Sequence, residues 1–214
     1  MQALVRGYKT TLKMSYRRSI SNTAPIALCL ITKFNKPESE EFNNTLATCL
    51  QSLGFSTATL WIKSETARFV TKPTKLQELN LQFALDWLIE KHINSSSKWL
   101  VGASLASTLA VNAIIRRPEI TNYLLIAPII DHNNLADVKL LTRLKSAGAT
   151  IIAGKDAATP ASAPLQLISF TKTLEVCTIE FIIIKQADHF FKNKLNNMSA
   201  AVAEFYAKTR SHHN

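Results

Sequence analysis

Hydrophobic residues along the chain gather in short continuous runs that are separated by longer segments of helical periodicity. Each run holds mostly apolar residues without polar alternation, which is the pattern of a strand covered on both faces. The runs that predict strands lie at 24–32, 55–62, 98–103, 121–128, 149–154 and 177–185.

The intervening segments, and the one after the last run, predict helices at 37–53, 73–92, 105–116, 134–146, 161–174 and 194–208. Pro37 followed by Glu38 and Glu40 is typical of a helix start, and Gly54 is typical of a helix end. Strands that alternate with helices in this way form a mostly parallel sheet with helices on both faces. We therefore expect a single α/β domain over residues 1–214.

The helix 73–92 carries two neighbouring apolar stripes, so we expect it to be well covered. The first stripe holds Leu76, Leu79, Phe83 and Trp87, and the second holds Leu81, Ala84, Leu85 and Leu88. His92 closes the helix, where a partly positive imidazole would complement the helix dipole.

Composition narrows the classes of protein that fit this chain. Hydrophobic residues make up 47% and charged residues 19%, which favours a folded chain over a disordered one. No apolar run reaches the roughly 20 residues of a membrane-spanning helix, so we expect no membrane span. The three cysteines show neither paired nor metal-ligand spacing, which favours a reducing compartment and no metal site. We expect a cytoplasmic location.

Seven Lys and Arg residues precede the first acidic residue, Glu38, and supply most of the net charge of +10. Two interpretations of residues 1–23 stay open. They form a strand pair with a basic outer face, or they are a targeting segment that directs the chain to the mitochondrial matrix. No aromatic and basic interleaving accompanies the charge, so we expect no nucleic-acid partner.

The five glycines restrict the chemistry further. None lies between residues 8 and 53, which excludes a phosphate-binding loop or a dinucleotide fingerprint after the first of these strands, and we expect no cofactor. Gly102 opens the segment "GASLA", which places Ser104 between a strand and a helix. A nucleophile elbow has this form, with small residues around the serine, and Ala106 replaces its second glycine. The alternative is an ordinary small residue at a tight turn.

A serine nucleophile needs a general base and an acid that orients it. Asp156 follows the strand 149–154, and His189 follows the strand 177–185. Both therefore belong to the carboxyl edge of the sheet, together with Ser104, in the chain order serine, acid, histidine. Asp131, after the strand 121–128, is the alternative acid.

Several segments together resemble the small bacterial α/β-hydrolases related to dienelactone hydrolase, and most closely a compact alphaproteobacterial group without a large lid. These segments are "TAPIALCL", "LGFSTATL", "WLVGASLA", "RRPEITNYLLIAP", "GKDAATP" and "ADHFF". The resemblance implies the α/β-hydrolase fold, with Ser104 as nucleophile, Asp156 as acid and His189 as base. It runs almost without gaps between "LKMSY" and "APIAL", which favours an N-terminal strand over a targeting segment.

The sequence departs from this family where the oxyanion of the reaction would be stabilised. "ITKFNKPES" replaces a turn rich in His and Pro and a Gly-Gly pair, and "LWIKSETARFV" replaces an Arg-Phe-Asn segment. We expect Leu105 to supply one backbone N–H to the oxyanion, and Thr32 or Lys33 to supply the second.

These residues and the resemblance they carry point to two functions. The first is a serine hydrolase of a small ester, thioester or lactone, which uses Ser104, His189 and Asp156. The second is a catalytically degenerate protein of the same fold that serves as a binding or accessory subunit, either as a homo-oligomer or in a larger assembly. The remodelled oxyanion segment and the basic N-terminus favour the second function, and the complete set of triad residues favours the first.

Overall fold

The computed structural model describes residues 1–33, 37–63, 73–129, 141, 146–155 and 179–211. The strands are β1 (Gln2–Gly7), β2 (Thr10–Arg17), β3 (Ile26–Lys33), β4 (Ser56–Lys63), β5 (Lys98–Ala103), β6 (Asn122–Ile126), β7 (Ala147–Ala153) and β8 (Ile179–Ile184). The helices are α1 (Pro37–Ser52), α2 (Lys75–Lys91), α3 (Ala106–Arg116) and α6 (Leu195–Ser211). The helices predicted at 134–146 and 161–174 lie outside the described residues, apart from Leu141 and Ser146.

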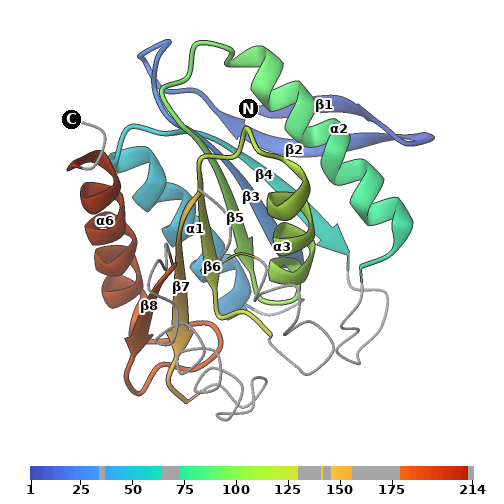
Figure 1. Ribbon diagram of the computed structural model, residues 1–214. Helices are drawn as coiled ribbons and strands as arrows, with labels where there is room; N and C mark the ends of the chain where they lie inside the picture. Colours follow the sequence, from blue (N-terminus) through green and yellow to red (C-terminus); the bar gives the residue numbers. More distant parts are fainter. Residues whose placement is uncertain (34–36, 64–72, 130–140, 142–145, 156–178, 212–214) are drawn as a thin grey trace.

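The described strands form one sheet in the order β1-β2-β4-β3-β5-β6-β7-β8. The pairs β1–β2 and β2–β4 are antiparallel, and all the later pairs are parallel. Helices α2 and α3 cover one face, and α1 and α6 cover the other (Figure 1). The mostly parallel sheet with helices on both faces confirms the fold class predicted from the hydrophobic pattern.

Burial along the strands explains this arrangement. All five residues of β6 are buried, as are the last five residues of β5, because helices cover both faces of the centre of the sheet. In β1 buried and exposed residues alternate strictly, and β2 follows the same rule over most of its length. The basic segment 1–17 therefore contributes a strand pair with one solvent face, on which Arg6, Lys13 and Arg17 lie.

The burial of α2 corrects the prediction that both of its apolar stripes are covered. Its second stripe is buried, and the residues concerned are Leu81, Ala84, Leu85 and Leu88. Leu76 and Phe83, from the first stripe, are 49% and 36% exposed. The helix packs against β1 and α3, and the first stripe meets the core only in part, through Trp87.

His92 at the end of α2 is buried rather than solvated. Its Nε2 lies 2.7 Å from the hydroxyl of Tyr16 on β2. Burial, with Arg18 and Lys91 as smaller contributions, lowers the pKa of His92. The prediction of a partly positive imidazole is therefore wrong, because burial favours the neutral form.

Among the helices of the described residues, none combines the length and the apolar character that a membrane crossing requires.

Candidate active site

Ser104 occupies the short step between β5 and the start of α3. Its backbone φ is +59°, in the left-handed region that costs non-glycine residues conformational energy. Its N–H donates to the carbonyl of Ile126 on β6, and its carbonyl accepts from the N–H of Ser107. The turn is thus fixed on both sides, and it holds Ser104 in a conformation typical of a nucleophile elbow.

Gly102 permits the close approach of α3 to β5 on which this turn depends. A Cβ atom at position 102 would lie 2.7 Å from the Cβ of Ala110 and 2.9 Å from the Cα of Ser107. Both distances are too short for carbon atoms, so any side chain here would displace the helix. The prediction that small residues mark a tight strand-to-helix crossing matches this packing.

His189 lies on a short segment between β8 and α6. Asp188 is exposed, and its carboxylate accepts hydrogen bonds from the N–H groups of Phe190 and Lys192. Gln186 and Phe191 on either side have positive φ angles. This chain of tight turns fixes the position of His189, and Asp188 serves the turn rather than the imidazole.

The Nε2 atom of His189 and the Oγ atom of Ser104 lie 2.7 Å apart. Ser104 is buried, at 7% exposed, and His189 is partly buried. The two residues are 85 positions apart in the chain, and the carboxyl ends of β5 and β8 bring them together. A serine hydroxyl in contact with an imidazole is the geometry of a nucleophile with its general base.

Asp156 and Asp131, the two candidate acids, lie outside the described residues. The chain leading to Asp156 is described as far as Lys155, whose N–H donates to the carbonyl of Ala187 at 2.8 Å. Gly154 donates in the same way to the carbonyl of Ile184. The segment that ends one residue before Asp156 is therefore hydrogen-bonded to the segment that carries His189.

Of the three residues considered as oxyanion donors, Thr32 lines the same cavity as Ser104. Leu105 follows Ser104 directly and is the N-cap residue of α3. Thr32 and Lys33 are the last residues of β3 and pair with Ile62 and Lys63 of β4. These two candidate donors therefore belong to the sheet itself rather than to a loop after it.

A small cavity lies directly beside the Ser104–His189 pair. Its volume is about 10 Å³, and most of the described residues around it are apolar. The described lining consists of Ile31, Thr32, Ser39, Phe42, Asn43, Ala103, Ser104, Ile126, Ala127, His189 and Phe190.

Two of these lining residues, Ser39 and Asn43, were not predicted as site residues from the sequence. Both are buried on α1, one helical turn apart. A signal for them is present in the sequence, since Asn43 falls between Phe42 and Leu46 on the apolar stripe of that helix. A polar residue within such a stripe marks a place where the core is interrupted.

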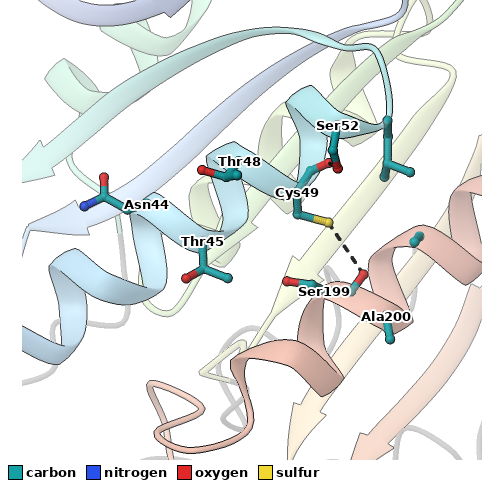
Figure 2. Close-up of a pocket in the computed structure, with 9 residues that line it drawn as sticks. Asn44, Thr45, Thr48, Cys49, Ser52, Ser199 and Ala200 are labelled. Atoms are coloured by element: carbon teal, nitrogen blue, oxygen red, sulfur yellow. Dashed lines mark hydrogen bonds between the residues drawn. The ribbon is translucent and has the colours of Figure 1, made fainter.

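A larger hollow of about 520 Å³ lies between α1 and α6, as Figure 2 shows. Its described lining contains neither Ser104 nor His189, and it is formed mostly by small and hydroxyl-bearing residues. Cys49 points across it toward the carbonyl of Ser199, 3.5 Å away. Burial raises the pKa of the Cys49 thiol, so it is a poor nucleophile. We place the candidate site at Ser104.

Comparison with known proteins agrees with this architecture. No family model matches the chain. An uncharacterized protein from Rickettsia prowazekii (strain Madrid E) is 29% identical over 135 residues, which are 61% of this chain and 57% of the Rickettsia protein. The match therefore spans just over half the length of that curated relative.

Several solved structures match the fold of this chain over almost its whole length. A protein of unknown function from Agrobacterium tumefaciens, provisionally named an alpha/beta hydrolase, has a TM-score of 0.83 at 24% identity over 99% of this chain and 97% of its own. A serine hydrolase without lid from Xanthomonas campestris has a TM-score of 0.73 at 15% identity, over 97% and 94% of the two chains.

A third structure, an alpha-beta serine hydrolase homologue from Coxiella burnetii, has a TM-score of 0.73 at 17% identity over 95% of this chain and 96% of its own. The chain therefore has the α/β-hydrolase fold, as the sequence predicts. The described residues contain no separate lid over the carboxyl edge of the sheet.

Proposed function

We propose that this protein is a serine hydrolase that cleaves a small ester, thioester or lactone, with Ser104 as nucleophile and His189 as general base. The observation that carries the proposal is the 2.7 Å contact between the Ser104 hydroxyl and His189 Nε2. A strained backbone at Ser104 supports it, because strain of this kind collects at catalytic residues. The similarity to serine hydrolases of known structure points to the same chemistry.

In the proposed reaction Ser104 Oγ attacks the carbonyl carbon of the substrate while His189 Nε2 takes the hydroxyl proton. The tetrahedral intermediate collapses, and the leaving alcohol or thiol takes this proton from His189. Water, deprotonated by His189, then attacks the acyl-serine, and the acid is released as Ser104 Oγ takes the proton back from His189. The N–H of Leu105, with a second backbone N–H from Thr32 or Lys33, stabilises the oxyanion in both halves.

Asp156 is the proposed acid that orients His189. Lys155, its neighbour in the chain, is hydrogen-bonded to Ala187, two residues before His189, which supports this choice over Asp131. An acid in this role holds the tautomer in which Nδ1 carries the proton, so that Nε2 can accept from serine.

Hydrolysis of short-chain nitrophenyl esters tests the proposal. We expect Ser104→Ala to reduce turnover to the level of buffer alone, with the melting temperature close to that of the wild type. Asp156→Asn should lower kcat by about 100-fold or more, and Asp131→Asn should not. Turnover by Ser104→Ala equal to that of the wild type would rule out this mechanism.

A further inference from the structure

Two residues that line the cavity beside Ser104 each carry a buried side-chain oxygen for which the described residues supply no hydrogen-bond partner. One is Oδ1 of Asn43 on α1, a residue that is 5% exposed, and the other is Oγ1 of Thr32 at the end of β3, 2% exposed. Both residues line the same cavity as Ser104 and His189. Buried polar groups in folded proteins nearly always find a partner, so two beside one cavity call for an explanation.

Folding alone does not account for Asn43. Its neighbours on the buried face of α1 are the polar Ser39 and the apolar Phe42, Leu46 and Leu50. An apolar residue at position 43 would extend this stripe, whereas a buried and unpaired amide oxygen destabilises the fold. Asn43 thus breaks the rule that buried helix positions hold apolar or hydrogen-bonded residues. Such an exception beside a nucleophile is typical of a residue that serves binding rather than stability.

The chemistry of the cavity indicates what would bind there. Asn43 Oδ1 can only accept a hydrogen bond, and the Thr32 hydroxyl can donate or accept. Apart from His189, the described lining holds no ionisable side chain that could neutralise an ammonium or carboxylate group, so a charged group would remain uncompensated. A volume of about 10 Å³ is close to the minimum for one group the size of water. A hydroxyl group can hydrogen-bond to both oxygens, carries no charge and is about the size of water, so it fits this cavity.

We propose that Asn43 determines substrate specificity by accepting a hydrogen bond from a hydroxyl group on the acyl part of the substrate. The Thr32 hydroxyl is the second contact and donates to the same oxygen. The substrate class is then a hydroxyacyl ester or thioester with its hydroxyl close to the carbonyl carbon, since the cavity adjoins Ser104. This inference rests on the proposed hydrolase function.

A comparison of matched esters tests the assignment. The substrates are the nitrophenyl esters of butanoic, 2-hydroxybutanoic and 3-hydroxybutanoic acids, and the readout is the ratio of kcat/KM for each hydroxy ester to that for butanoate. The proteins are the wild type, Asn43→Leu, and Asn44→Leu as a matched control. Asn44 is the next residue on α1 and is exposed, so the control makes the same chemical change outside the cavity.

We expect the wild type to favour at least one hydroxy ester by about tenfold or more, because a site built to hydrogen-bond a hydroxyl discriminates against the analogue without it. Asn43→Leu should bring that ratio close to one, and Asn44→Leu should leave it unchanged. A wild-type ratio near one for both hydroxy esters would overturn the inference. An equal loss on all three esters in Asn43→Leu would also overturn it, because Asn43 would then act on the carbonyl that all three share.

Thr32 provides a second and independent variant. Thr32→Val keeps the shape of the side chain and removes the hydroxyl, so the ratio of kcat/KM for the hydroxy ester to that for butanoate should fall. Thr32→Ser keeps the hydroxyl, so the ratio should stay close to that of the wild type. A ratio unaffected by Thr32→Val would remove Thr32 from the assignment.

Covalent labelling by a fluorophosphonate separates failure of this inference from failure of the proposed function. A labelled Ser104 with a ratio near one removes the inference and leaves the hydrolase. An unlabelled Ser104 with no turnover of any ester removes both.

Discussion

The backbone of Ser104 connects the sequence to the chemistry most directly. Its φ of +59° is strained for any residue with a Cβ atom. Ala127, which also lines the cavity, has a φ of +43°. The strain is maintained by the hydrogen bonds and packing of the turn, and it holds the hydroxyl group toward His189.

This strain predicts an unusual order of stability among variants. Ser104→Gly should be more stable than Ser104→Ala by about 1 kcal/mol, because only glycine adopts this φ without steric cost. Both variants lose the contact with His189, so the comparison isolates the backbone. Urea denaturation of the two proteins measures the difference in the free energy of unfolding.

Ser107, the second residue of α3, supplies the control for this comparison. Its backbone is helical, so Ser107→Gly should be less stable than Ser107→Ala, which is the opposite order. A Ser104→Ala variant as stable as Ser104→Gly would contradict the assignment of strain to this turn.

At the scale of elements, the hydrophobic pattern predicted strands well where both faces of the sheet are buried. The runs at 98–103 and 121–128 become β5 and β6, in which nearly every residue is buried. The pattern overestimated the burial of α2, because two neighbouring apolar stripes do not show that Leu76 and Phe83 would stay exposed. The sequence pattern also missed Asn43 as a site residue. Whether a helix position is buried beside a site depends on the elements that pack against it, which the local pattern does not show.

The contact between Tyr16 on β2 and His92 at the end of α2 predicts how the free energy of unfolding depends on pH. His92 is buried against Tyr16, and its folded-state pKa lies below the usual value near 6.5. Above this usual value both the folded and the unfolded imidazole are neutral. As the pH falls below it, the unfolded chain takes up a proton that the folded chain does not, so the free energy of unfolding decreases.

The contribution of His92 can be isolated with His92→Gln, which can still form a hydrogen bond with the Tyr16 hydroxyl. We expect the free energy of unfolding of the wild type to fall relative to the variant between about pH 7.5 and 5.5, by at most about 1.4 kcal/mol per pH unit. Chemical denaturation across this range measures it. Parallel pH profiles for the two proteins would show that His92 titrates alike in the folded and unfolded chains.

At the scale of the whole molecule, the parallel sheet places distant residues at one edge. The sequence predicted that Ser104 and His189 would share the carboxyl edge, because each follows a strand of the same sheet. It could not provide the contact itself, since the 2.7 Å distance depends on the turns between β8 and α6. The roles of Asp156 and of the oxyanion donors stay predictions, as does the substrate.

Labelling by a fluorophosphonate probe, followed by intact mass and peptide mapping, tests the central claim most directly. We predict one probe per chain, attached to Ser104, with a labelling rate reduced by about 100-fold or more in His189→Gln. A folded wild-type chain that takes up no probe, or that carries it on another residue, would contradict the account.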